Sequence, residues 1–302
     1  MATGRGAAGP TKRDRREEAR ETARLMREEA AKKAKRRKVI VQSSVIVGVL
    51  AVLTIVGLVI YSSVSASSNV ANPKNMLSGG ILLTQADQAV TTAAIAGGDA
   101  PTPTTQKLDG KTAHIQIWLD YQCPYCDQFE TTNSDQMKQM MADGTATLEI
   151  HPVAILDSSQ NNKYSTRAGA AAACVANYEP DKFFDINSAL FANQPDEQTG
   201  SGLTNAEILK LFKDAGVESK QITDCVNNQT YAQFVTNRTK EAVASKQLAN
   251  PTSGGFGTPT VFVNGERYQG GFTDATQFAS FVQAAVKDAG DSGSVTFPKK
   301  ES

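Results

Sequence analysis

The chain has 302 residues, in which 31 Lys and Arg balance 31 Asp and Glu to a formal net charge of zero. A chain of this length holds one or two domains, and it shows no internal repeat, which excludes a repeat architecture. The charge is unevenly distributed: residues 1–38 contain 14 basic and 6 acidic residues, a net of +8, so residues 39–302 carry −8.

The basic arm, residues 1–38, is interpreted as a polar cytoplasmic segment. Its Glu and Arg residues recur at spacings of three and four, which suits a solvated helix with charge pairs. Adhesion to anionic lipid is the alternative. The arm has no aromatic residue and many glutamates, so we do not expect it to bind nucleic acid.

Residues 39–61 are free of charge and rich in Val, Ile and Leu. As a helix this segment spans roughly 34 Å, enough to cross a hydrocarbon core of about 30 Å. Basic residues precede it and no charge follows until Lys74, which places the N-terminus in the cytoplasm and the rest outside. A signal peptide cleaved near Ser65-Ala66 is the alternative, but the apolar run exceeds the usual length of about 7–15 residues. We therefore predict a signal anchor, with a single pass through the cell membrane.

The segments that follow alternate between strand-like and helix-like patterns. In chain order we expect a polar linker (62–76), an edge strand (79–84), a loop (85–110), a buried strand (113–120), a helix (123–142), a second strand (145–156), a helical block (about 163–248), a strand (260–264) with a hairpin partner (267–269), a final helix (273–289) and a disordered tail (291–302). Together these segments predict an α/β fold over residues 77–290.

The buried strand at 113–120 leads directly into Cys123-Pro124-Tyr125-Cys126 at the start of a helix. Two cysteines at this spacing can close a small disulfide. The free N–H groups and the dipole of a helix N-terminus favour a thiolate on the first of them. Because the thiolate is the attacking species in thiol–disulfide exchange, the segment indicates a redox pair. A structural disulfide is the alternative.

All four cysteines lie after the predicted membrane span, and an even number in an oxidising compartment suggests two disulfides. Cys174 and Cys225 would then close a loop of about 50 residues, worth on the order of 4 kcal/mol in the chain-entropy model. A second redox pair is the alternative.

A zinc site at Cys123 and Cys126 would need two further ligands. The remaining cysteines, with His114 and His151, offer none at short paired spacing. We expect no metal and no cofactor.

The chain resembles the DsbA-like thioredoxin-fold family, in particular its membrane-anchored bacterial members. The resemblance covers roughly residues 77–290. It depends on the segment Trp-Leu-Asp-Tyr-Gln-Cys-Pro-Tyr-Cys-Asp-Gln-Phe at 118–129, on Gly-Thr-Pro-Thr at 257–260, and on the helical block between them. It implies a thioredoxin-like fold with a helical insertion.

The resemblance also implies individual roles. Cys123 resembles the exposed nucleophile that forms a mixed disulfide with substrate, and Cys126 resembles the buried thiol that resolves it. Pro259 is similar to the cis-proline that faces the disulfide, an isomer that costs about 0.5–1 kcal/mol; an ordinary trans proline is the alternative. Thr258 would present backbone groups to an extended peptide, and Tyr125 would be an exposed aromatic residue at the substrate surface.

Two features depart from the family. Relatives often carry a buried carboxylate six residues before the first active cysteine, where this chain has Ile117; Asp120 and His114 are nearby in sequence but do not match that position. The dipeptide Pro124-Tyr125 lacks the histidine of the strongest oxidants, so a less extreme redox potential is expected.

We interpret the chain as a dithiol oxidase outside the cell membrane. Its substrates would be exported cysteine-containing proteins, and the resemblance implies a membrane redox partner that reoxidises it. A reductase or isomerase of the same fold, for instance in cytochrome maturation, is one alternative. A non-catalytic peptide-binding chaperone is the other.

Overall fold

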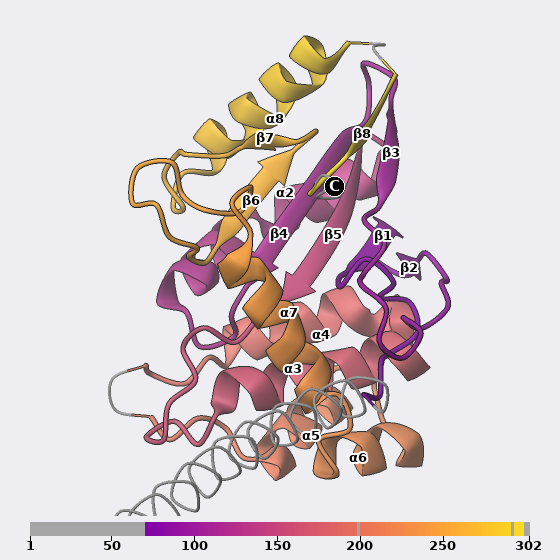
Figure 1. Cartoon of the computed structure of the whole chain (residues 1–302), viewed down its shortest axis with the longest axis vertical. Helices are drawn as coiled ribbons and strands as arrows, with labels where there is room; N and C mark the ends of the chain where they lie inside the picture. Colours follow the sequence, from indigo (N-terminus) through magenta and orange to yellow (C-terminus); the bar gives the residue numbers. More distant parts are fainter. Residues whose placement is uncertain (1–69, 198–199, 291–292, 299–302) are drawn as a thin grey trace, which may run out of the picture. The chain divides into compact units, whose positions relative to one another are not determined.

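The computed structural model describes residues 70–197, 200–290 and 293–298 (Figure 1). The predicted basic arm, the predicted membrane span at 39–61 and most of the linker lie outside these residues. None of the helices in the described ranges is both long and apolar enough to cross a membrane.

The central sheet has the strand order β2-β1-β5-β4-β6-β7, in which β4 and β5 are parallel and the other neighbours are antiparallel. A separate ribbon pairs β3 with β8. The strands are β1 (Ile81–Gln85), β2 (Gln88–Ala89), β3 (Thr105–Leu108), β4 (Ala113–Leu119), β5 (Ala146–Pro152), β6 (Thr260–Val263), β7 (Glu266–Arg267) and β8 (Gly293–Thr296).

Every residue of β4 is buried because the strand is covered on both faces. Its odd-numbered residues, such as Ile117, join one apolar cluster with Phe129 of α2 (Pro124–Ala142) and Phe278 of α8 (Ala275–Ala289). Its even-numbered Trp118 faces the other way. This period of two is the geometry of a pleated strand, and it explains why the segment reads as a continuous apolar run.

The opposite face of the sheet carries a smaller cluster, which contains Trp118 of β4, Phe262 of β6 and Ala242 of α7 (Ala232–Ala244). Figure 1 shows α7 and the β3–β8 ribbon on this side and α2 on the other. Phe297, just after β8, packs on Phe262 with ring centroids 4.1 Å apart. The Gln116 side chain also donates a hydrogen bond to the Phe297 carbonyl at 2.9 Å.

These contacts correct the prediction of a disordered tail for the described residues 293–298. Residues 293–296 form β8, and the ring of Phe297 packs against the rings of Trp118 and Phe262. Burial of this apolar ring holds the segment in place. The prediction of a loop at 85–110 is wrong in part for the same reason, since β3 lies in that segment and is the partner of β8. The strand predicted at 79–84 is β1, but it is not an edge strand because the short β2 pairs outside it.

The predicted helical insertion is present between β5 and β6. Its helices are α3 (Tyr164–Tyr178), the short 3₁₀ turn η1 (Pro180–Lys182), α4 (Phe183–Ala192), α5 (Asn205–Asp214), α6 (Lys220–Asn227) and α7. Figure 1 shows α3 to α6 beyond the carboxyl ends of β4 and β5. This end of the sheet is also where the segment with Cys123 begins, so the insertion adjoins the site.

The predicted strand and hairpin after residue 259 are β6 and β7. Asn264 and Gly265 form the turn, with φ of 51° and 84°. Both values lie in the left-handed region, which Asn and Gly occupy more readily than other residues and which a two-residue hairpin turn requires. The turn pairs β7 with β6. The antiparallel register of β6 with β4, in which Thr260 lies opposite Trp118, places residues 258–259 at the carboxyl end of β4.

Candidate active site

Cys123 is the N-cap residue of α2, and Pro124 occupies the first helical turn. Proline suits this position because its fixed φ matches the helix and its missing N–H would have no intrahelical partner. The amides of Cys126 and Asp127 donate to the Cys123 carbonyl at 3.0 and 3.1 Å. The helix therefore starts between the two cysteines, as the sequence predicts.

The loop before β6 covers the first thiol. Cys123 Sγ lies 3.3 Å from the carbonyl oxygen of Thr258, and the Thr258–Pro259 peptide bond is cis. Gln194 Nε2 donates to the Cys123 carbonyl at 3.0 Å from the other side. The two segments that carry the family resemblance thus meet in space, and the contact between the Cys123 sulfur and the Thr258 carbonyl joins residues 135 positions apart in the sequence.

Both thiols are free, and both residues are buried: Cys123 keeps 4% of its surface exposed and Cys126 keeps 1%. The expectation of an exposed nucleophile therefore needs correction. The Thr258 carbonyl contacts the Cys123 sulfur, and the Gln194 side chain contacts the Cys123 backbone.

Hydrogen bonding and burial separate the pKa values of the two thiols. The Cys126 thiol, and then Thr258, lower the pKa of Cys123 from 9.0 to about 7, although burial opposes this shift. The α2 backbone amides, which the sequence argument emphasised, contribute less. Burial raises the pKa of Cys126 well above its usual value. Of the two thiols, Cys123 is therefore the one that loses its proton more readily at neutral pH.

Two buried carboxyl groups lie near the thiols. Asp120 follows β4 directly, and burial raises its pKa from 3.8 to about 6. Glu130 lies one turn after Cys126 on α2; neither of its carboxyl oxygens has a hydrogen-bond partner among the described residues, and burial raises its pKa from 4.5 to about 7. The sequence argument noted Asp120 but missed Glu130, although its spacing of four from Cys126 and seven from Met137 places it on the buried face of α2.

The remaining predicted site residues fall into two groups. Tyr125 is 59% exposed on the first turn of α2, with its ring 6.2 Å from that of Phe272. Cys174 of α3 and Cys225 of α6 are joined in a disulfide, with both residues buried. Because this bond occupies their sulfurs, neither cysteine can serve as a zinc ligand beside Cys123. No sequence pattern marks Gln194 as a site residue, because it lies in a loop after α4.

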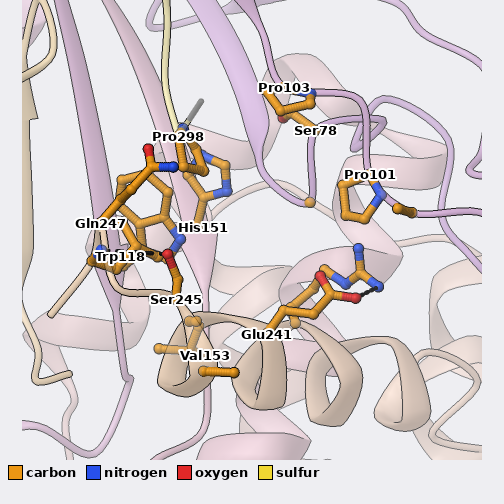
Figure 2. A pocket seen from close by; sticks show the side chains of 16 residues that line it. Ser78, Pro101, Pro103, Trp118, His151, Val153, Glu241, Ser245, Gln247 and Pro298 are labelled. Carbon is orange, nitrogen blue, oxygen red and sulfur yellow. Dashed lines mark hydrogen bonds and ion pairs between the residues drawn. The ribbon is translucent and has the colours of Figure 1, made fainter. Parts of the chain in front are cut away.

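A separate cavity lies away from the thiols. It has a volume of about 470 Å³ and lies on the α7 face of the sheet. Figure 2 shows Trp118 and His151 on one side of it and Pro101 and Glu241 on the other. The Trp118 and His151 rings stack with centroids 4.3 Å apart. Neither thiol lines this cavity, so His151 has no part in the thiol site.

A buried thiol with a raised pKa, a second thiol with a lowered pKa and a cis-proline loop beside them are the parts needed for thiol–disulfide exchange. The domain is a dithiol:disulfide oxidoreductase of thioredoxin-like fold. The chain belongs to the thioredoxin family, whose model matches residues 110–287.

Two solved structures are similar to this chain. An oxidised DsbA from Mycobacterium tuberculosis is 25% identical, with a TM-score of 0.52; the match covers 68% of this chain and 92% of that one. MdbA from Corynebacterium diphtheriae, named a thiol-disulfide oxidoreductase, is 16% identical with a TM-score of 0.51 over 72% of this chain and 95% of that one. This second likeness shows a shared fold.

The sequence is also similar to part of a much longer protein. The serine/threonine-protein kinase PknE of Mycobacterium tuberculosis is 34% identical over 152 residues, which make up 49% of this chain and 26% of the kinase. The chain thus spans about a quarter of the length of the curated relatives it matches.

Proposed function

We propose that this protein oxidises pairs of thiols in exported proteins through Cys123 and Cys126. The observation that carries the proposal is the separation of the two pKa values, about 7 for Cys123 and well above the usual value for Cys126. Because its pKa is lower, Cys123 is the better leaving group, whereas Cys126 keeps its proton more readily. The likeness to DsbA supports thiol–disulfide exchange at this site, and the oxidase direction is inferred from the family resemblance.

The reaction has two exchange steps. A substrate thiolate attacks Cys123 Sγ of the enzyme disulfide, the bond to Cys126 breaks, and Cys126 leaves with the electron pair and takes a proton. A second substrate thiolate then attacks the substrate sulfur of the mixed disulfide, and Cys123 leaves as a thiolate. The substrate loses two electrons and the enzyme gains them. The Thr258 backbone would hold the substrate strand beside Cys123, and Tyr125 would give it an aromatic surface.

A Cys123 pKa of about 7 matches that of thioredoxin more closely than the value of about 3.5 in the strongest oxidants. We therefore expect a redox potential less oxidising than about −120 mV. Equilibration with glutathione measures it. A potential near or below about −270 mV would instead identify a reductant.

We further propose that residues 39–61 anchor the domain outside the cell membrane and that a membrane redox partner reoxidises it. The charge-free apolar run and the basic residues before it support the anchor. The partner is inferred from the family resemblance alone.

A trapping experiment tests the function. In cells, Cys126→Ala should hold substrates as mixed disulfides on Cys123, because no resolving thiol remains, and non-reducing gels followed by mass spectrometry should identify exported cysteine-containing proteins. The matched control is the double variant with Cys123→Ser, which should trap nothing. A Cys123→Ser protein that still supports every cellular role would favour a peptide-binding chaperone and contradict the oxidase.

A further inference from the structure

Two glutamine side chains link the segment before the first thiol to the loop that follows α4. Gln194 Nε2 donates to the Tyr121 carbonyl at 3.1 Å and to the Cys123 carbonyl at 3.0 Å. In the opposite direction, Gln122 Nε2 donates to the Pro195 carbonyl at 2.8 Å. Each segment therefore binds the backbone of the other. We call these three hydrogen bonds the glutamine clamp.

The chemistry of the clamp favours a side-chain amide at position 194. The amide nitrogen of glutamine carries two hydrogens, and both of its partners here are backbone carbonyl oxygens, on either side of Gln122. An ionised carboxylate or an apolar side chain of the same length has no donor to offer them. Gln194 therefore satisfies two carbonyls at once and joins them through one atom.

Helix α4 holds the same segment through further contacts. Tyr121 Oη donates to Asn187 Oδ1 of α4 at 3.0 Å, and the Tyr121 ring lies 5.2 Å from that of Phe191. Tyr121 and Gln122 are fully buried. The residue two positions before Cys123 is thus fixed by packing, and the clamp extends this hold to the backbone of Cys123 itself.

The Cys123 carbonyl is where the clamp meets α2. It accepts from the amides of Cys126 and Asp127 at 3.0 and 3.1 Å, and from Gln194 at 3.0 Å. The first two bonds join it to α2 and the third joins it to the helical insertion. Beyond the backbone, Cys123 Sγ lies 3.3 Å from the Thr258 carbonyl. The direction of the sulfur is therefore set by three segments of the chain.

Orientation matters most in the step that closes the disulfide. In this step the Cys126 thiolate bonds to Cys123 Sγ of a mixed disulfide, and the bond from Cys123 to the foreign sulfur breaks, with the electron pair leaving on that sulfur. Closure is intramolecular, so its rate depends on how well the reacting atoms are aligned, and a displacement of about 1 Å can cost about 100-fold. Attack by Cys123 on a small external disulfide has no such requirement.

We propose that Gln194 is a positioning residue, which holds the Cys123 backbone so that its sulfur stays in line with Cys126. Its hydrogen bonds go to backbone carbonyls and not to either sulfur, so it acts through Cys123. The role rests on the proposed exchange at Cys123 and Cys126, and it adds a group from the helical insertion to that site. The insertion then helps to set the rate at which the pair closes.

Gln194→Met tests this role, because it keeps the length of the side chain and removes the donor. The purified, reduced full chain is mixed with a substoichiometric amount of Ellman's reagent. The first thionitrobenzoate released reports attack by Cys123, and the second reports closure by Cys126. In Gln194→Met the attack rate should stay close to that of the wild type, whereas closure should slow about tenfold.

Equilibration with glutathione provides a second readout. Once the disulfide has formed, its ring fixes the two cysteines without help, so the clamp should matter less for opening than for closure. A tenfold slower closure then lowers the equilibrium constant for disulfide formation tenfold, and the potential of the pair should rise by about 30 mV. Loss of a purely structural hydrogen bond would lower stability and leave this potential unchanged.

Asn193→Ala is the matched control. Asn193 precedes Gln194 in the loop, and its side-chain amide also donates to a backbone carbonyl, that of Ala189 at 2.9 Å, but this bond stays within α4 and its loop. The control should close at the wild-type rate and keep the wild-type potential. Equal slowing in both variants overturns the proposal, and so does a Gln194→Met protein with unchanged closure and potential.

If Gln194→Met does not fold by circular dichroism, Gln194→Asn decides. Its amide keeps the donor but is one methylene too short to reach both carbonyls, so closure at the wild-type rate would contradict the role.

Failure of this proposal is distinguishable from failure of the oxidase. The oxidase is judged by which proteins the Cys126→Ala variant traps in cells, while Gln194 is judged by the rate of closure in vitro. A protein that traps exported substrates but closes without dependence on Gln194 would refute the positioning role alone.

Discussion

At the scale of single residues, the two thiols differ because each one modifies the other. The Cys126 thiol makes the largest contribution to the lowered pKa of Cys123. Cys126→Ala removes this hydrogen bond, so the Cys123 pKa should rise above about 7. The pH midpoint of Cys123 alkylation by iodoacetamide measures the change, with Cys123→Ser as the blank. An unmoved midpoint would assign the lowered pKa to Thr258 and the helix instead.

Glu130 should make stability depend on pH. Its folded pKa of about 7 lies above the ordinary value of 4.5, so the folded state binds more protons than the unfolded state between these values. Stability is then greatest below pH 4.5 and falls as the pH rises to 7. Glu130→Gln should raise the free energy of unfolding at pH 8 by up to about 3 kcal/mol.

Urea denaturation of the reduced protein at pH 8 and pH 4.5 checks the Glu130 prediction. The variant and the wild type should differ much less at the lower pH, where Glu130 is largely protonated in both states. An equal gain at both values would mean that the carboxyl group is not charged in the folded protein.

At the scale of secondary-structure elements, the bond between Cys174 and Cys225 ties α3 to α6 across a sequence separation of 51. Replacing both cysteines with alanine should lower the free energy of unfolding by about 2–4 kcal/mol, because the unfolded chain is no longer constrained. Thiol exchange at Cys123 should persist. If stability holds while exchange is lost, the bridge is a second redox pair.

The β8 segment gives a second test at this scale. Phe297 packs against Phe262 and Trp118, with centroids 4.1 and 6.3 Å apart. Phe297→Ala should cost about 1–2 kcal/mol, less than a fully buried phenylalanine because this side chain is partly exposed. Trp118 is the only tryptophan in the chain, so its fluorescence should shift as its cover is lost. An unchanged spectrum would mean that the tail does not pack in solution.

At the scale of the whole molecule, the predicted orientation can be tested in intact cells. After mild reduction, a membrane-impermeant maleimide should label Cys123 of the full chain, and the protein should sediment with membranes, because residues 39–61 are long and apolar enough to span them. A variant with two arginines introduced into that segment should leave the membrane fraction. Labelling only after lysis would place the thiols in the cytoplasm.

Much of the fold could be predicted because its signals are local. The all-buried β4, the β6–β7 hairpin with its Asn264-Gly265 turn, and the order of strand, thiol helix and helical insertion each follow from periodicity or from turn chemistry. The pairing of β3 with β8 joins residues about 190 positions apart. Neither strand has an apolar alternation of its own, so nothing local announces it.

Sequence by itself predicted which residues form the site: the spacing of Cys123 and Cys126 at the start of a helix indicated a redox pair, and the family resemblance added the proline loop at 259. Tertiary structure alone decided how those residues behave. Burial sets the pKa values of Cys126, Asp120 and Glu130, and burial is a sum over neighbours contributed by distant segments. For that reason Asp120, an ordinary acidic residue in the sequence, has a raised pKa only because α2 and the loop at Leu156 enclose it.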